Sequence, residues 1–350
     1  MDASTLHVRH RRPMPPHALL ALILLAWPFP PALAHHSDSM YDASRSVSVQ
    51  GFVTRYVWVN PHVYIYLVQQ PGPGGSTIEW EIEGSPPSIL HRLGWSPGTL
   101  KAGDPIAVTG HPSRNPSLHA LLPVTIRSGT TVLFDRGSEE KQLSTVAAAT
   151  SAPRSGISGI WLTPYVKAID DLTDPDHMKL TPAGRSAYKH FDERKNPASR
   201  CVAYTAPAFM TTPDLKRITE RGDTVLIESE FDAAERTVYL NQLSHDGVPS
   251  SLQGHSIGHW EGRSLVIDTA RFSVNLVGNA YGLPSGTQKH LVERLTQSDD
   301  GHSLLYHFEL SDPEYLARPI VGEITWQFQP TALYAPPGCN LDVARHYIRQ

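Results

Sequence analysis

The segment Gly254–Gly262, with the sequence GHSIGHWEG, holds the densest group of chemically active side chains. On a strand, His255, His259 and Glu261 would share one face, because side chains alternate between the two faces. Imidazole and carboxylate groups can transfer protons or bind a polar ligand, and the neighbouring Trp260 could line such a site. The flanking glycines disfavour a helix and allow a ligand to approach the backbone. The alternative is a tight aromatic hairpin whose histidines bond only to the backbone.

Glu293 is a second candidate. In the stretch KHLVERL, period-two alternation places Leu291, Glu293 and Leu295 on one strand face. A carboxylate between leucines is expected to be desolvated, which raises its pKa unless a cation lies nearby. His259 or Arg236 could be that neighbour. Glu293 would then transfer protons with His259 as its partner; the alternative is a structural Glu–Arg pair.

Asp312-Pro313 follows a predicted strand, where loops often carry binding groups, although aspartate before proline is also an ordinary turn signal. The candidate catalytic residues are therefore Glu293, His259 and Asp312, and the candidate ligand-binding residues are His255, Trp260, Glu261, Arg294, Tyr315 and Arg318.

The first 34 residues have the pattern of an export signal. Arg9, Arg11 and Arg12 precede the apolar run 18–27, and the segment 32–34 (ALA) resembles a cleavage site. The apolar run is about half the ~20 residues that a spanning helix needs, so we expect no stable membrane span after cleavage. The sequence predicts a periplasmic or secreted protein.

Cleavage after residue 34 would leave a histidine at the new N-terminus. The α-amine and imidazole of His35 could chelate copper, with His36 and His62 as further ligands and His111 or His119 as substitutes. Copper is thus a candidate cofactor. The alternative is a frayed terminus with solvated histidines.

Export also bears on the two cysteines. Cys201 and Cys339 would lie in an oxidising compartment, where two thiols of one chain tend to pair. Neither belongs to a C-x-x-C motif, so we expect a structural disulfide.

The positions of strands and turns indicate a mainly β protein. Predicted strands at 46–58, 63–68, 77–82, 105–110 and 121–126, with a short helix at 86–93, follow the order of an oligonucleotide/oligosaccharide-binding (OB) barrel. Further strands are predicted at 224–231, 236–240, 264–269, 289–296, 303–310 and 323–328, after a helix that begins at Thr181-Pro182. We therefore expect a signal peptide (1–34), an OB-like domain (35–136), a mobile linker (137–159) and an antiparallel barrel or sandwich (160–345).

Two groups of motifs carry a family resemblance. The first group is His35-His36-Ser37, Met40-Tyr41-Asp42, Trp58-Val59-Asn60-Pro61-His62, Glu83-Gly84-Ser85-Pro86, Gly94-Trp95 and Gly103-Asp104. The second is Gly254–Gly262, Leu265–Thr269, Glu293-Arg294 and Asp312-Pro313. With these motifs the chain resembles secreted bacterial proteins of unknown function in which His-His-Ser follows the signal peptide and a GHWEG-containing domain is fused behind. The resemblance implies an exported two-domain protein and supplies no activity.

The net charge and the absence of nucleotide-binding motifs disfavour several classes of function. The formal charge of −4 over 350 residues gives no basic patch for nucleic acid, and no P-loop or G-x-G-x-x-G motif is present. We therefore expect an exported protein that binds a small molecule or an envelope component. Two alternatives remain: a general acid/base enzyme (an isomerase, lyase or hydrolase) that uses Glu293 and His259, and a periplasmic copper protein built on His35.

Overall fold

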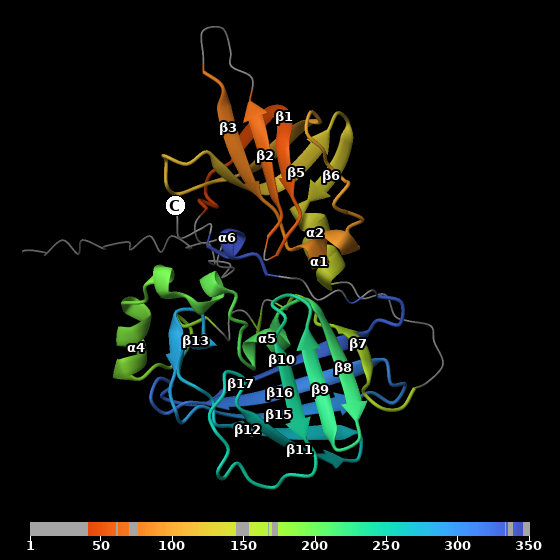
Figure 1. Cartoon of the computed structure of the whole chain (residues 1–350), viewed down its shortest axis with the longest axis vertical. Helices are drawn as coiled ribbons and strands as arrows, with labels where there is room; N and C mark the ends of the chain where they lie inside the picture. The colour runs from red at the N-terminus through yellow and green to blue at the C-terminus, as the bar shows by residue number, and fades with distance from the viewer. Residues whose placement is uncertain are drawn as a thin grey trace, which may run out of the picture. The chain divides into compact units, whose positions relative to one another are not determined.

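The computed structural model describes residues 41–60, 62–69, 76–144, 154–166, 168–169, 174–332, 334 and 339–345. The predicted signal peptide, His35 and His36 lie outside these residues. Within the described part, no helix is both long and apolar enough to cross a bilayer. The fold is mainly β, as the sequence predicts, and contains two barrels (Figure 1).

The N-terminal barrel is OB-like. Its strands are β1 (Val47–Val57), β2 (Tyr64–Gln69), β3 (Ile78–Glu83), β4 (Pro105–Pro112), β5 (Ala120–Ser128) and β6 (Thr131–Asp135). They are ordered β3-β2-β1-β4-β5-β6, and a parallel pairing of β3 with β5 closes the barrel. Helix α1 (Pro87–Arg92) connects β3 to β4. This order of elements confirms the expected OB topology.

Alternating apolar side chains fill this barrel. Val49, Val53, Ile65 and Leu67 are each at most 2% exposed. Gly51 lets β1 approach β2 closely, because a Cβ there would lie 2.1 Å from the carbonyl oxygen of Val68.

Helix α2 (Arg136–Ser144) occupies the first part of the segment expected to be a linker. The sequence RGSEEKQLS has no apolar stripe, so periodicity gives no sign of this helix.

The C-terminal barrel is closed, which decides between the barrel and the sandwich that the sequence left open. Its strands are β7 (Gly159–Leu162), β8 (Leu215–Arg221), β9 (Thr224–Ser229), β10 (Glu235–Tyr239), β11 (His255–Glu261), β12 (Ser264–Ala270), β15 (His290–Gln297), β16 (Ser303–Ser311) and β17 (Ile320–Phe328). Neighbouring strands are antiparallel, except that β10 and β11 run parallel.

Shorter elements accompany the C-terminal barrel. They are α4 (Pro182–Lys189), the 3₁₀ turns η2 (Glu193–Lys195) and η3 (Pro197–Arg200), α5 (Ala208–Thr211), β13 (Asn275–Ala280), β14 (Leu283–Ser285) and α6 (Leu341–Ala344). Helix α4 begins as predicted, since the Thr181 hydroxyl accepts a hydrogen bond from the Gly184 N–H at 3.0 Å. The structure also contains the predicted disulfide between Cys201 and Cys339, whose Cα atoms lie 5.9 Å apart.

Strand β15 shows how the sequence positions the polar groups described below. Residues 289, 291, 293, 295 and 297 are each at most 5% exposed, whereas Val292 and Arg294 between them are more accessible. Odd-numbered side chains therefore point into the barrel and even-numbered ones point outward.

Candidate functional site

An ion pair lies inside the C-terminal barrel between β10 and β15. Nη1 of Arg236 donates to Oε2 of Glu293 at 2.5 Å, and Nη2 donates to Oε1 at 3.0 Å. Arg236 is 2% exposed and Glu293 is fully buried. Of the two neighbours proposed from sequence for Glu293, Arg236 is the one that the structure supplies.

Two further side chains complete this inner cluster. The Tyr306 hydroxyl of β16 donates to Oε1 of Glu293 at 2.7 Å, and burial raises the pKa of that phenol. Nη2 of Arg236 also donates to the Met210 sulfur of α5 at 3.7 Å. The Glu293 side chain thus accepts three hydrogen bonds, two of them from the Arg236 guanidinium.

Two buried donors at this site have no acceptor among the described residues. They are Nε of Arg236 and Nε1 of Trp326. Trp326 of β17 is fully buried, and its ring centroid lies 5.5 Å from that of Tyr306. Because an unpaired buried donor costs about 1–3 kcal/mol, these two N–H groups are the polar atoms of the barrel best suited to meet an added acceptor.

Lys289 lies at the start of β15 on the same inner face as Glu293. Its Nζ donates to the Thr205 hydroxyl at 2.9 Å, to the Ala206 carbonyl at 2.7 Å and to the Gly278 carbonyl. Burial lowers the pKa of this ammonium to about 7, while the carboxylates of Asp312 and Glu293 act in the opposite direction. Lys289 is therefore an amine held by uncharged acceptors in a dry environment that disfavours its protonated form.

Asp312 is an anchor for the chain around it. It is 1% exposed, and its Oδ2 accepts hydrogen bonds from Nδ2 of Asn279 at 2.8 Å and from the Gly286 N–H at 2.7 Å. Its backbone carbonyl accepts from the N–H groups of Tyr315 and Leu316. These contacts match the turn role that competes with the catalytic one. Arg318 is exposed, and Tyr315 packs partly buried against the core.

A second buried ion pair, Lys216 with Asp214, was not predicted. Nζ of Lys216 also donates to the Thr212 carbonyl at 2.9 Å, and Oδ2 of Asp214 accepts from the Ser229 hydroxyl at 2.7 Å. These bonds hold the start of β8 against the end of β9.

The structure does not bring His259 to Glu293. His259 pairs with Val266, which pairs with Arg294, whereas Glu293 pairs with Ile267. His259 and Glu293 therefore lie on opposite faces of the sheet.

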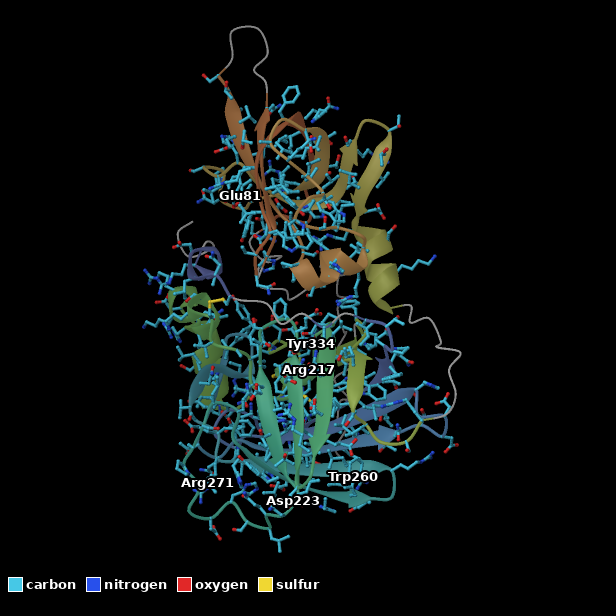
Figure 2. All side chains as sticks on the ribbon, turned by 45° about the vertical axis from the view of Figure 1, so that its right-hand side comes forward. Glu81, Arg217, Asp223, Trp260, Arg271 and Tyr334 are labelled. Atoms are coloured by element: carbon cyan, nitrogen blue, oxygen red, sulfur yellow. A yellow bond between two sulfur atoms is a disulfide. The ribbon has the colours of Figure 1, made fainter. Side chains whose placement is uncertain are left out.

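On the outer face, the side chain of His259 is 63% exposed, and its Nε2 lies 3.0 Å from Glu261 Oε1. Nη2 of Arg294 donates to Glu261 Oε2 at 2.8 Å. Trp260, which lies between His259 and Glu261 in the sequence, is 38% exposed near the end of β11 (Figure 2).

His255 has different neighbours from His259 and Glu261, although the three share the outer face of β11, as the alternation predicts. It is 6% exposed, and its Nδ1 lies 2.8 Å from Nδ1 of His245, which comes from the loop between β10 and β11. Nε2 of His245 in turn lies 2.8 Å from Oδ1 of Asp268. The sequence pattern gives no signal for His245, because this contact joins a loop to a distant strand.

The segment GHSIG (254–258) also fits the pattern G-x-S-x-G, which marks the nucleophile turn of many serine hydrolases. Ser256 lies within β11, is 1% exposed and shares a 2.9 Å hydrogen bond with the Thr269 hydroxyl. A buried strand serine does not have the exposed strand-to-helix geometry that this chemistry needs.

The described histidines of the proposed copper set lie apart in the N-terminal barrel. Nδ1 of His62 lies 3.6 Å from Glu83 Oε1, and the same carboxylate accepts from the Tyr41 hydroxyl through Oε2 at 3.0 Å. His111 bonds to a backbone carbonyl, and His119 contacts the Trp80 ring. Among the described residues, no group of three or more His, Cys, Asp or Glu side chains is arranged to hold a metal ion.

A family model described as a family of unknown function (DUF6152) matches residues 24–122, a stretch that includes β1 to β4 and the start of β5. The C-terminal barrel lies outside the matched residues. No curated protein matches the chain.

Proposed function

We propose that this chain is an exported binding protein whose C-terminal barrel takes a small carboxylate. The supporting observation is the pair of unpaired buried donors, Nε of Arg236 and Nε1 of Trp326, beside an ion pair that engages both terminal nitrogens of the guanidinium. A carboxylate or carbonyl oxygen is the acceptor that such N–H groups pair with best. The aromatic rings of Tyr306 and Phe308 suit an apolar body on that ligand.

Binding fits the inner cluster better than proton transfer does. Both oxygens of Glu293 already accept hydrogen bonds, from Arg236 and Tyr306, so the carboxylate is engaged by structural partners. Its proposed partner His259 lies on the opposite face of the sheet. The acid/base alternative therefore loses the geometry that it requires.

Export is part of the same proposal. It is supported by the leader pattern of residues 1–34 and by the disulfide between Cys201 and Cys339, since structural disulfides are typical of oxidising compartments. Intact-mass measurement of the protein from its native host should give a chain that begins at His35. A chain that retains residues 1–34 would contradict the export assignment.

Calorimetric titration with benzoate and hexanoate tests the binding site. Trp326→Phe keeps most of the ring volume and removes one donor, so we expect at least tenfold weaker binding and nearly unchanged stability. Trp161→Phe is the matched control, because its Nε1 already donates to the Ile157 carbonyl at 2.8 Å; it should lower stability and leave affinity unchanged. No binding of either carboxylate, or equal affinity in the Trp326→Phe variant, would overturn the proposal.

A further inference from the structure

The loop between β10 and β11 is fastened to the outer wall of the C-terminal barrel by a chain of hydrogen-bonded side chains. We call these the histidine chain; they are Gln242, His255, His245, Asp268 and His290. His245 Nδ1 lies 2.8 Å from His255 Nδ1, His245 Nε2 lies 2.8 Å from Asp268 Oδ1, and His255 Nε2 lies 2.7 Å from Gln242 Oε1. Nε2 of His290 lies 3.0 Å from Asp268 Oδ2. The chain thus joins the loop to β11, β12 and β15.

The contact between the two Nδ1 atoms limits how many protons the two rings can hold. Asp268 presents only oxygens, so Nε2 of His245 carries hydrogen, whereas the Gln242 amide can accept from or donate to Nε2 of His255. Only one hydrogen can lie between the two Nδ1 atoms, so one ring donates there and the other accepts. The two rings together therefore hold at most one positive charge while this contact persists.

This arrangement tolerates no second positive charge. If both rings become imidazoliums, two N–H groups face each other 2.8 Å apart and two positive rings are in contact. Burial and the charge of His245 lower the pKa of His255, which is the direction expected for a ring that resists protonation while the loop is closed. Protonation is less favourable in the closed loop than in the detached one. The closed loop therefore loses stability as the pH falls below the ordinary histidine pKa of about 6.5.

We propose that residues 240–248 form a latch that detaches from the barrel wall when His245 and His255 are both protonated. This inference does not depend on the proposed carboxylate site, because the latch lies on the outer face and the ion pair lies inside.

Other charged groups also lie at the latch. Arg271 donates from Nε to the His245 carbonyl at 3.1 Å, and the backbone carbonyl of Asp223 accepts from the Leu240 N–H at 2.8 Å. Figure 2 places Asp223 and Arg271 in the same lower part of the view. The remaining groups nearby are Asp246 within the loop, Tyr239 against the His255 ring, and Glu309 and His290 on the strands beyond Asp268.

His290 works in the opposite direction and from outside the latch. Asp268 raises its pKa, so the His290–Asp268 contact strengthens in acid, but it joins two barrel strands and no loop residue. It therefore provides a matched control for the loss of one titrating histidine beside the same carboxylate.

Hydrogen exchange of the full chain tests the latch. After correction for intrinsic rates, the amides of residues 240–248 should exchange at least tenfold faster at pH 5.0 than at pH 7.5. His255→Asn places an amide oxygen near Nδ1 as an acceptor that does not titrate, so its loop should change less than twofold. His290→Asn should keep the tenfold response. A pH-independent loop in the unmodified chain, or an unchanged response in His255→Asn, would overturn the inference.

A second measurement covers the case in which His255→Asn does not fold. In the unmodified chain, nuclear magnetic resonance titration should show the loop amides shifting over the same pH range as the His255 ring. Loop shifts that follow a different group, or none, would overturn the latch.

Discussion

Glu293 and Arg236 form a two-point ion pair in the interior of a closed barrel, with each carboxylate oxygen accepting one guanidinium hydrogen bond. Both residues are at most 2% exposed. At such depth the mutual attraction of the charges is offset by their desolvation, so the pair as a whole adds little stability, whereas removal of one member leaves a buried charge.

This asymmetry predicts the behaviour of single and double variants. Glu293→Gln should lower the free energy of unfolding by about 3–5 kcal/mol, because Arg236 loses its counter-charge. The double variant Arg236→Met with Glu293→Leu should recover most of that loss. Urea unfolding of the three chains measures both effects. A double variant no more stable than Glu293→Gln would contradict this account.

Lys289 predicts a pH dependence of stability. In the folded chain its pKa is lowered to about 7 from 10.5, so between these values the unfolded chain binds more protons than the folded one. The free energy of unfolding should therefore rise with pH, by at most about 1.4 kcal/mol per pH unit from this residue.

The control for this prediction is Lys289→Met, which has no proton to release. Urea unfolding from pH 7.5 to 8.5, more than one unit below the ordinary tyrosine pKa of about 10, should show a steeper rise for the unmodified chain than for the variant. Equal slopes would show that Lys289 does not carry the effect.

Gly184 lies at a position of α4 that has no room for a larger side chain. A Cβ there would lie 2.3 Å from the Tyr315 carbonyl oxygen, so Gly184→Ala must displace the helix or the chain that it packs on. We expect a loss of about 1–3 kcal/mol, typical of overpacking. Gly98→Ala is the control, because its Cβ would have no neighbour closer than 3.8 Å, and it should leave the stability nearly unchanged. Thermal unfolding of both variants and the unmodified chain measures the two effects.

The disulfide predicts a large effect of reduction. Cys201 and Cys339 are separated by 138 residues, and closing a loop of that length stabilises a fold by about 4–5 kcal/mol in the chain-entropy model. The Cys201→Ala, Cys339→Ala double variant should unfold at correspondingly lower urea concentration. The unmodified chain in reducing buffer should match it, and a reduced chain as stable as the oxidised one would contradict the prediction.

The sequence predicts which segments form strands, and which side chains point inward, better than it predicts which strands pair and in which register. Period-two alternation correctly places Glu293 inward and Arg294 outward, and by the same rule Lys289 could have been assigned to the inner face. His259 could not be assigned to a face relative to Glu293, because that relation depends on the register across β12.

Some buried or hydrogen-bonded residues follow no hydrophobic pattern in the sequence. Strand β8 begins LKRIT, which reads as polar although Lys216 is buried through its pair with Asp214. His245 gives no periodic signal at all, since its partners lie 10 and 23 residues further along the chain. The side chains that only a three-dimensional structure reveals here are Tyr306, Trp326, Lys216 and His245.

A ring made only of antiparallel neighbours must contain an even number of members, because direction alternates at every step. The C-terminal barrel closes with nine, so one junction has to break the alternation, and the chain places it between β10 and β11. Two consecutive parallel strands need a connection that returns along the barrel to the end at which the first strand began. The stretch that bears Gln242 and His245 is this return path, so an odd count of strands is the topological reason that a proton-responsive segment lies on the outside of the molecule.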